Sequence, residues 1–565
     1  MNKNVSKNKK SSEFQRQYRP ASGIRPPGSD PTLGARKIQN MYYNYESGAL
    51  ESFPGFRRLY SFGERIHTLF SLTHSCKKEY IYIHAGVGLY RIEKEKRDGI
   101  SRLTPIAELK DKKSVCLSTG ELAFISDGEQ LFGIDREGEV RLLSDSADIT
   151  GCTLMAVYDG RLFLSGNPSL PGVVIYSSKM AGSLPESLDE GKFTEGADVI
   201  SLLGTAEGLF VFTAGSAGGI IKRTSSGEAY PVSHTVSGMT AKEAIALEGR
   251  LILLTPRGLY SLSGLTAESE TKIKCLSEEI SGRFCRGDWH IGGVFLGYIL
   301  LYCGSEILLW DTASPGWYLL NGIGSYEGDS PVYRYSSFAE EGYSLHPLPD
   351  TVCHGEAMSL INESGKAVYY ENCEEKYSIY PTEERSGGSL YGISCLKCES
   401  GLIWFGSECG ALCLFNNDKM QYTDGEGFID PSYYSFAGHA PEYLLELFYD
   451  DCGKSGLTKS TVPGSFIIKF KAFPKSSVTV KINADGEQLF CRRLSPSSMR
   501  FSDMDFENLS ASTADAVCVS VPERRTLWHE KQIILSGGEF CSPFGIISLG
   551  FRYKTHGTAS KKLQQ

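Results

Sequence analysis

The cysteines near residue 400 have the spacing in this chain that best suits chemistry. Cys395 and Cys398 form a C-x2-C pair, and Cys409 and Cys413 follow with three residues between them. Four thiolates delivered by two hairpin arms can hold Zn²⁺ tetrahedrally, so these residues are a weak candidate metal site. Cys409 and Cys413 also lie within the strand-like run SECGALCLF, and free cysteine is commonly a small buried hydrophobe, which is the competing interpretation.

Motifs for catalysis and nucleotide binding are absent from the sequence. It contains no Walker A loop, complete G-x-G-x-x-G, G-x-S-x-G, H-E-x-x-H or EF-hand loop. His84 lies in an expected strand, where a core or rim role is favoured over that of a general base. Arg286-Gly287-Asp288 is an integrin-type tripeptide, for which chance occurrence is the preferred interpretation. We therefore expect no catalytic residue, no cofactor and no enzymatic activity.

A repeated strand pattern dominates the middle of the chain. An apolar strand, a glycine-bearing turn, a second apolar strand and an aromatic-bearing strand recur about every 46 residues. The eight copies begin at Glu79, Gly120, Asp159, Glu207, Glu248, Gly297, Gly355 and Ser400. This period is typical of one four-stranded propeller blade, and helical periodicity is nearly absent. The sequence predicts an all-β fold in which residues 65–425 form a β-propeller of about six to eight blades. A β-solenoid or stacked sandwiches are the alternative.

Side chains within each copy have predictable positions. Leu251 and Leu253 are expected to pack between neighbouring blades, and Gly258 is expected to supply the positive φ of a tight turn.

The chain changes character after about residue 425. Segments that begin at Ser465 and Ser477 alternate apolar and polar residues, and Asp485-Gly486 is a hairpin signal. Further strand-like runs begin at Asp515, Lys531 and Phe544. We expect a C-terminal β-sandwich or barrel over residues 426–556, followed by a disordered tail at 557–565.

Charge is unevenly distributed along the chain. Residues 1–37 carry nine Lys or Arg and two Asp or Glu, a net charge of +7, whereas the whole chain carries −9, which leaves −16 for the rest. Residues 1–35 are expected to form a disordered basic arm, either a solubilising tail or an arm that orders on a protein or DNA partner. The acidic body argues against sequence-independent binding along nucleic acid.

No apolar run is long enough for a transmembrane helix, and no secretory signal is evident. The 16 cysteines are therefore expected to be free thiols.

Residues 36–64 are expected to form an extended lead-in segment, and part of it carries a family resemblance. Asn40-Met41-Tyr42, Gly48-Ala49-Leu50 and Pro54-Gly55-Phe56 are similar to three steps that lead into the propeller of a class of phage tail proteins. Matches also occur in HAGVGLYRI from His84 and, near the C-terminus, at Gln532, Pro543, Phe544 and Tyr553. Over most of residues 36–556 the chain resembles tail nozzle, tail tubular and packaged-DNA stabilisation proteins of short-tailed phages and prophages.

The resemblance implies a structural virion component that guides or retains DNA at the portal-adaptor exit. Members of this class form rings, commonly six-fold, below the portal and adaptor. The implied partners are further copies of the chain, portal and adaptor proteins, and DNA that passes without sequence-specific binding and is ejected. The implied location is the virion tail, after synthesis in the bacterial cytoplasm. Aromatic anchors in the lead-in segment would pack on the propeller or on a neighbour, although an ordinary first strand and loop is the alternative. These interface candidates are Tyr42, Tyr43, Phe53 and Phe56.

Two other functions remain open. A β-propeller binding module for a glycan or protein at a host surface would use clustered aromatic and acidic residues on one rim, such as Trp289, Trp317 and Tyr318. A propeller hydrolase would need two converging carboxylates with raised pKa values at the central channel.

Overall fold

The computed structural model describes residues 13–556 and divides the chain into two compact units. Within that span it does not describe residues 27, 95–99, 215–218, 234–240, 266–271, 315, 327–332, 340–341, 348–358, 362–366, 370–377, 382–389, 400, 417–433, 438, 474–475, 497–503, 506–509, 512–515, 524–525 and 540–541. One unit comprises Arg57–Ile307 and Ile323–Phe415, and the other comprises Met1–Phe56, Leu308–Gly322 and Asn416–Gln565.

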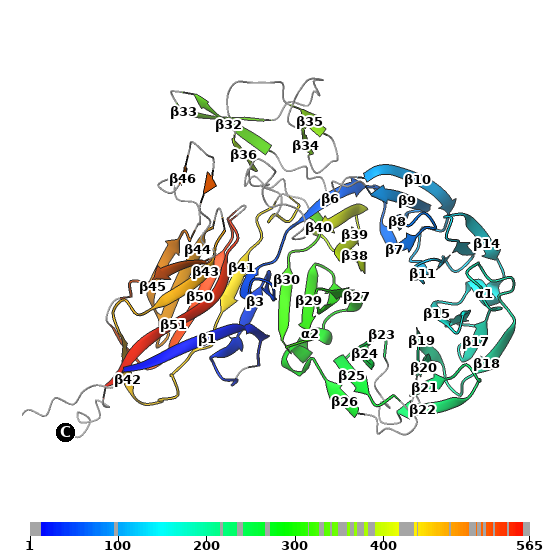
Figure 1. The fold of residues 1–565 in the computed structure, drawn as a ribbon, viewed down its shortest axis with the longest axis horizontal. Helices are drawn as coiled ribbons and strands as arrows, with labels where there is room; N and C mark the ends of the chain where they lie inside the picture. Colours follow the sequence, from blue (N-terminus) through cyan, green and yellow to red (C-terminus); the bar gives the residue numbers. More distant parts are fainter. Residues whose placement is uncertain are drawn as a thin grey trace, which may run out of the picture. The chain divides into compact units, whose positions relative to one another are not determined.

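The first unit is a ring of seven β-sheet blades (Figure 1). Blades 1 to 5 are four-stranded antiparallel meanders in which the chain runs outward from an innermost strand. The innermost strands β7, β11, β15, β19, β23, β27 and β38 contact one another in that order, and β38 contacts β7, which closes the ring.

The strands of the first three blades have the following bounds. They are β7 (Ile66–Thr73), β8 (Glu79–Ala85), β9 (Gly88–Lys94) and β10 (Ile100–Glu108); β11 (Val115–Ser118), β12 (Ala123–Ser126), β13 (Leu131–Ile134) and β14 (Val140–Ser144); and β15 (Leu154–Tyr158), β16 (Arg161–Ser165), β17 (Val173–Tyr176) and β18 (Gly191–Thr194).

Blades 4 and 5 continue the four-stranded pattern, and blade 6 contributes the three strands β27, β28 and β29. Their strands are β19 (Val199–Thr205), β20 (Gly208–Thr213), β21 (Ile220–Arg223) and β22 (Ala229–Ser233); β23 (Glu243–Leu247), β24 (Arg250–Thr255), β25 (Gly258–Ser263) and β26 (Lys272–Cys275); and β27 (His290–Phe295), β28 (Tyr298–Cys303) and β29 (Glu306–Asp311). The helical segments are α1 (Ala147–Thr150), η1 (Glu278–Ile280) and α2 (Ser281–Phe284).

Blade 7 joins distant parts of the sequence. Its strands are β38 (Ile393–Glu399), β39 (Leu402–Ser407), β40 (Ala411–Phe415) and β6 (Phe56–Ser61). β6 precedes blade 1 in sequence and pairs with β40 at the outer edge of blade 7. The first strand and the last strands of the propeller segment therefore belong to one sheet.

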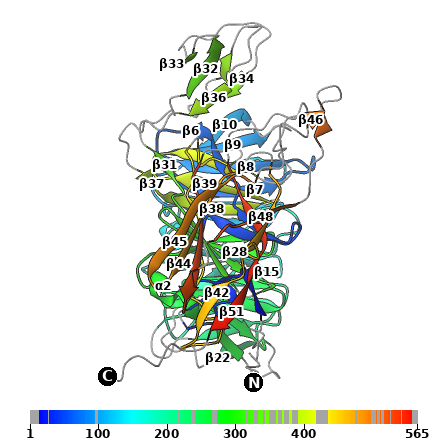
Figure 2. The same cartoon turned by 90° about the vertical axis from the view of Figure 1, so that its left-hand side faces the viewer.

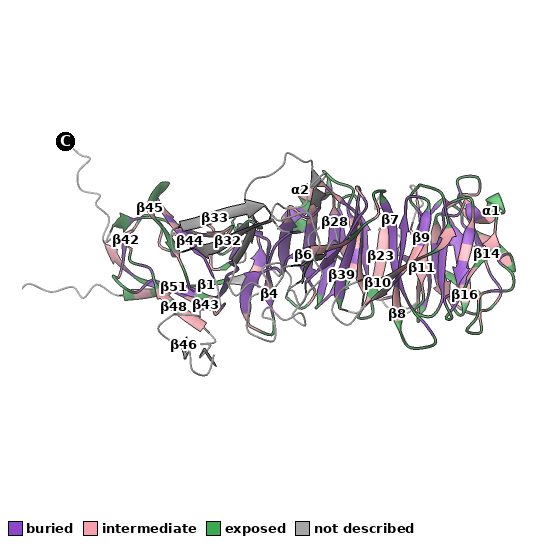
Figure 3. Ribbon diagram, turned by 90° about the horizontal axis from the view of Figure 1, so that it is seen from above, coloured by how far each residue is buried: buried purple, intermediate pink, exposed green. Residues whose placement is uncertain are grey.

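Apolar side chains from adjacent blades form the propeller core. Leu251, Leu253 and Leu262 of blade 5 pack with Phe210 and Phe212 of blade 4, as the repeat predicts. Buried residues lie along the strands and exposed residues lie at the turns (Figure 3). Gly258 has φ 142°, and a Cβ at this position would clash with the Ser277 hydroxyl.

Between blades 6 and 7 the described residues form short sheets of two or three strands. The repeat copy that begins at Gly355 forms only the two-stranded sheet of β34 (Ser359–Ile361) and β35 (Ala367–Tyr369) among the described residues. The other short strands are β31 (Ser325–Tyr326), β32 (Tyr333–Ala339), β33 (Gly342–Pro347), β36 (Ser378–Pro381) and β37 (Leu390–Tyr391).

The second unit is a two-sheet β-sandwich. In one sheet β51 (Gly545–His556) pairs with β1 (Glu13–Ile24) and β5 (Ala49–Ser52) along one edge, and with β42 (Thr458–Thr461) and β43 (Ile467–Lys471) along the other. The strands farther out in that sheet are β4 (Met41–Asn44), β48 (Ala516–Ser520) and β49 (Leu527–Trp528).

The other sheet of the sandwich has the order β45–β44–β50–β41–β3–β30. These strands are β45 (Glu487–Leu494), β44 (Val478–Ala484), β50 (Lys531–Gly537), β41 (Tyr443–Glu446), β3 (Lys37–Gln39) and β30 (Trp317–Asn321). The β44–β45 pair is prominent in Figure 2. Two short additions complete the unit, β2 (Leu33–Ala35) beside β1 and the pair β46 (Met504–Asp505) and β47 (Ser510–Ala511).

The predicted fold class is confirmed, since an all-β propeller is followed by a β-sandwich, and seven blades fall within the expected range. The expectation that residues 1–35 are disordered is wrong for Glu13–Ile24 and Leu33–Ala35, which form β1 and β2. Tyr18 is buried, and β1 pairs with β51 over residues 13–18, so these residues gain the partner strand that they lack in isolation. Among the described residues no helix is long and apolar enough to cross a membrane.

The lead-in segment is also divided between the two units. β3, β4 and β5 belong to the sandwich, whereas β6 belongs to blade 7. The sandwich therefore uses three separate stretches of chain and is not confined to residues 426–556.

Candidate functional site

Charged side chains gather where the innermost propeller strands begin. Because each of the first five blades has four antiparallel strands, the chain enters successive innermost strands at the same end of the ring. We call this end the strand-start rim and define it by Asp111, Lys113, Lys242, Glu243, Asp288 and His290.

A hydrogen-bonded network links blades 5 and 6 at this rim. His290 Nδ1 lies 2.6 Å from Glu243 Oε1, and the Ile291 backbone N–H donates to Glu243 Oε2 at 2.7 Å. His290 also stacks on Tyr302, with the ring centroids 5.4 Å apart. The Glu243 carboxylate thus fixes both the backbone and the imidazole at the start of β27.

Asp288 has the most exposed acidic side chain of the rim. Its side chain is 81% exposed, pairs with the Lys242 ammonium, and lies 3.5 Å from His290 Nε2. The hydrogen bond from Lys242 lowers the pKa of Asp288, and the electrostatic influence of Lys242, His290 and Lys113 acts in the same direction. Lys113 belongs to the loop before blade 2, so residues from three blades influence one carboxylate. This arrangement suits the binding of charged groups. A glycosidase acid requires a raised pKa, the opposite of what Asp288 has.

A buried polar cluster lies beside the rim between blades 1 and 2. His67 Nε2 contacts Asp111 Oδ1 at 2.8 Å, and His84 Nδ1 contacts the Ser114 hydroxyl at 2.8 Å. Burial, followed by the nearby His67, lowers the pKa of His84 to about 4. His84 is therefore neutral at pH 7, which fits the expected core or rim role better than that of a general base.

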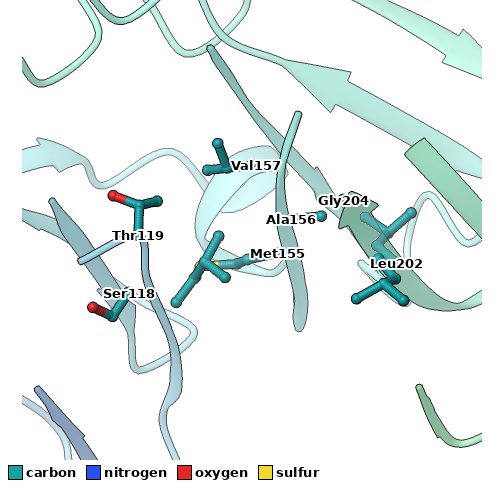
Figure 4. Close-up of a pocket in the computed structure, with 9 residues that line it drawn as sticks. Ser118, Thr119, Met155, Ala156, Val157, Leu202 and Gly204 are labelled. Carbon is teal, nitrogen blue, oxygen red and sulfur yellow. The ribbon is translucent and has the colours of Figure 1, made fainter. Parts of the chain in front are cut away.

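The opposite ends of β11, β15 and β19 line a cavity of about 330 Å³ (Figure 4). Leu117, Val157 and Leu202 supply half-buried apolar side chains to its wall. The other lining residues are Ser118, Thr119, Met155, Ala156, Leu203 and Gly204. The wall of this cavity carries no charged side chain, unlike the strand-start rim.

The four aromatic residues proposed as interface anchors lie mostly in the sandwich core. Tyr42, Phe53 and Phe56 are buried, and Tyr43 is half-buried. Tyr42 packs edge-on against Phe53, and Phe56 stacks on Phe436. The proposal that Tyr42, Phe53 and Phe56 meet a partner protein is therefore wrong, because their rings are used within the chain.

The zinc site proposed at Cys395, Cys398, Cys409 and Cys413 is not formed. The described part of the chain contains no group of three or more His, Cys, Asp or Glu side chains placed to hold a metal. Burial raises the pKa of Cys395 and of Cys398 to about 12, which disfavours the thiolate that zinc requires. Instead, these two residues pack tightly, with Cys398 against Gly293 and Cys395 against Gly406. Cys395 is buried and Cys398 is half-buried, and both behave as small packed hydrophobes.

The aromatic rim proposed for glycan binding is also not present. Trp289, Trp317 and Tyr318 are all buried, and the Trp289 indole N–H donates to the Arg283 carbonyl at 3.2 Å. Sequence reasoning missed Glu243 and His290. Both lie a few residues before a repeat copy, where they begin the innermost strands β23 and β27, so extending each copy to its upstream strand would have placed them at one end of the ring.

Comparisons with known proteins identify no family. No family model and no curated protein matches the chain.

Solved structures with similar folds include virginiamycin B lyase from Staphylococcus aureus, with 12% identity and a TM-score of 0.37 over 64% of this chain and 99% of the lyase. The Pan2 WD40 domain of Neurospora crassa has 6% identity and a TM-score of 0.35 over 64% of this chain and 96% of that domain. BamB from Moraxella catarrhalis has 11% identity and a TM-score of 0.33 over 72% of this chain and 97% of BamB. An extracellular domain from B. thetaiotaomicron is also similar, and only 40% of its length is covered. At these TM-scores the similarities carry no argument about function.

Proposed function

We propose that this chain is a non-catalytic binding and scaffold module whose propeller holds a charged protein segment at the strand-start rim. The observation that carries the proposal is the convergence of Lys113, Lys242 and His290 on the exposed carboxylate of Asp288. Preorganised charges of both signs favour a partner with complementary charges and fix its orientation.

A protein partner fits this rim better than a glycan. The aromatic side chains that could have offered flat apolar platforms to sugar rings, Trp289, Trp317 and Tyr318, are buried. The residues that define the rim carry ionisable side chains. Among those that form ion pairs, Asp288 has the most exposed side chain. Such groups pair with the side chains and termini of a peptide.

A peptide array probed with the full-length chain tests this proposal. The array carries short peptides of acidic, basic and alternating charge, and a glycan array is probed in parallel. We expect a subset of charged peptides to bind, with binding weakened by salt and lost in Asp288→Lys. Glu121→Lys is the matched control, because Glu121 is an exposed acid in the turn after β11, at the opposite end of the ring from the rim. Binding that survives Asp288→Lys, or binding only to glycans, would contradict the proposal.

On the resemblance at residues 36–58, we also propose that the module works in the tail of a phage or prophage. Asn40 shows how the matched segment packs in this chain. Asn40 adopts φ 56°, its side-chain amide donates to the Glu442 carbonyl at 2.9 Å, and its side-chain oxygen accepts from the Asn321 N–H at 2.7 Å. The matched segment is thus an integral part of the sandwich.

In this role the chain would assemble as a ring, dock on portal or adaptor proteins and surround passing DNA. Mass spectrometry of purified particles tests it. We expect several copies per portal ring, and absence from intact tailed particles would exclude the role while leaving the rim proposal open.

A further inference from the structure

Two buried imidazoles between blades 1 and 2 each have one ring nitrogen without a partner. His67 is 6% exposed, His84 is 0% exposed, and their ring centroids lie 4.8 Å apart. Nδ1 of His67 and Nε2 of His84 have no hydrogen-bond partner. A buried polar atom without a partner is unfavourable, and here two such atoms lie on adjacent rings.

The hydrogen bonds around His84 fix its tautomer. The Ser114 hydroxyl donates its single proton to Thr68 Oγ1 at 2.8 Å. The 2.8 Å contact between His84 Nδ1 and Ser114 Oγ therefore has the imidazole N–H as donor. Nε2 of His84 is left with a lone pair.

His67 is oriented in the same way by a carboxylate. Its Nε2 lies 2.8 Å from Asp111 Oδ1, and an ionised carboxylate only accepts hydrogen bonds. Nε2 of His67 is thus the N–H donor, so Nδ1 is the nitrogen through which this ring would bind a metal ion. The two nitrogens without partners, Nδ1 of His67 and Nε2 of His84, are therefore the ones available to an electron-pair acceptor.

We propose that His67 and His84 bind one divalent transition-metal ion, such as Zn²⁺. Imidazole nitrogens are preferred ligands of zinc, copper and nickel. Metal-bound histidines usually donate their other N–H to a carboxylate or a similar acceptor, as His67 does to Asp111 and His84 does to Ser114.

The ring separation agrees with this assignment. With Zn–N distances of about 2.1 Å, two imidazoles on one tetrahedral ion have centroids about 5 Å apart, close to the 4.8 Å found here. The chain supplies two donors, and water takes the remaining positions. Asp111 is 64% exposed, so the site borders solvent at the rim and has a negative charge beside it.

Isothermal titration of the tag-free, chelator-treated full-length chain with Zn²⁺ alone tests the proposal. We expect one equivalent to bind, and His67→Gln or His84→Gln to weaken binding at least tenfold. Asp111→Asn, which removes a positioning carboxylate, is expected to weaken binding about 10- to 100-fold. His529→Gln is the matched control, because His529 is an exposed histidine of the sandwich, and the zinc affinity of this variant should be unchanged.

A second measurement covers the case in which a buried variant fails to fold. The unmodified chain is titrated with Co²⁺, whose visible absorption bands report nitrogen ligands and low coordination number. Absence of saturable binding by the unmodified chain would overturn the proposal, as would equal zinc affinity in a folded His84→Gln chain. A bridging water would then be the occupant.

Discussion

His290 Nδ1 lies 2.6 Å from Glu243 Oε1, which joins the first residues of the innermost strands of blades 5 and 6. The same carboxylate accepts the Ile291 N–H at 2.7 Å. Glu243→Gln keeps the shape and removes the charge, so we expect a loss of about 1 kcal/mol, because both side chains are partly exposed. Urea unfolding measures the change. Glu121→Gln serves as the control, and an equal loss in both variants would contradict the assigned role of Glu243.

Arg16 fastens the first strand through a buried carboxylate. It contacts Asp450 through Nε and Nη2 at 2.6 and 2.8 Å, and the Asp450 side chain is 0% exposed. Arg16→Met leaves that charge buried with only the Tyr18 hydroxyl and a backbone N–H, so we expect a loss of about 3–5 kcal/mol in urea unfolding.

Two variants sharpen the Arg16 test. The double substitution Arg16→Met with Asp450→Leu should recover part of the loss, because no unpaired charge remains. Arg19→Met, on the exposed side of β1, should change stability little. An Arg16→Met chain as stable as Arg19→Met would show that β1 is not held by this ion pair.

The buried His84 predicts a loss of stability in acid. Its folded pKa of about 4 lies below the ordinary value of about 6.5. As the pH falls from about 6.5 toward 4, the unfolded chain binds a proton that the folded chain does not, so the free energy of unfolding decreases. The pKa of His74 is also lowered, mainly by burial, and acts in the same direction. Urea unfolding of the metal-free chain at pH 7, 6 and 5 should show this decrease, and His84→Gln should reduce it. An unchanged pH dependence in that variant would contradict the account.

Cys395 and Cys398 should react slowly with thiol reagents. Burial raises the pKa of both thiols to about 12, whereas Cys491 and Cys518 are exposed. Iodoacetamide labelling at pH 7.5, followed by peptide mass spectrometry, should modify Cys491 and Cys518 well before the other two. Equal labelling rates would show that blade 7 opens or that the thiols are activated.

Gly204 allows blades 3 and 4 to approach closely. A Cβ at Gly204 would clash with the Val157 carbonyl oxygen, whereas a Cβ at Gly196 would meet no atom within 4 Å. We expect Gly204→Ala to cost about 1–3 kcal/mol and to lower the melting temperature, while Gly196→Ala has little effect. Equal melting temperatures would mean that the backbone adjusts at no cost.

The propeller could be predicted because its evidence is local and repeated. Alternating residues such as Leu251 and Leu253 and turn glycines such as Gly258 recur at the blade period, so eight weak signals support one another. The copy that begins at Gly355 differs from the others, because its described residues form the two-stranded sheet of β34 and β35.

The sites depended on contacts that the sequence does not show. Arg16 and Asp450 are 434 residues apart, and neither residue type indicates a buried pair. Tyr42 and Phe53 were expected at an interface because aromatic residues often anchor interfaces, but the strands around them, which come from the far end of the chain, could not be placed in advance. The separation of His67 and His84 likewise follows from the pairing of β7 with β8.

Hydrogen–deuterium exchange of the full-length chain, with and without the best peptide from the array, tests the rim proposal most directly. We predict slower exchange at residues 111–114 and 288–291, which include Lys113 and Asp288 of the strand-start rim, and no change at residues 117–121 at the other end of β11. Protection confined to the sandwich, or to the far end of the innermost strands, would contradict the claim that the propeller binds its partner at this rim.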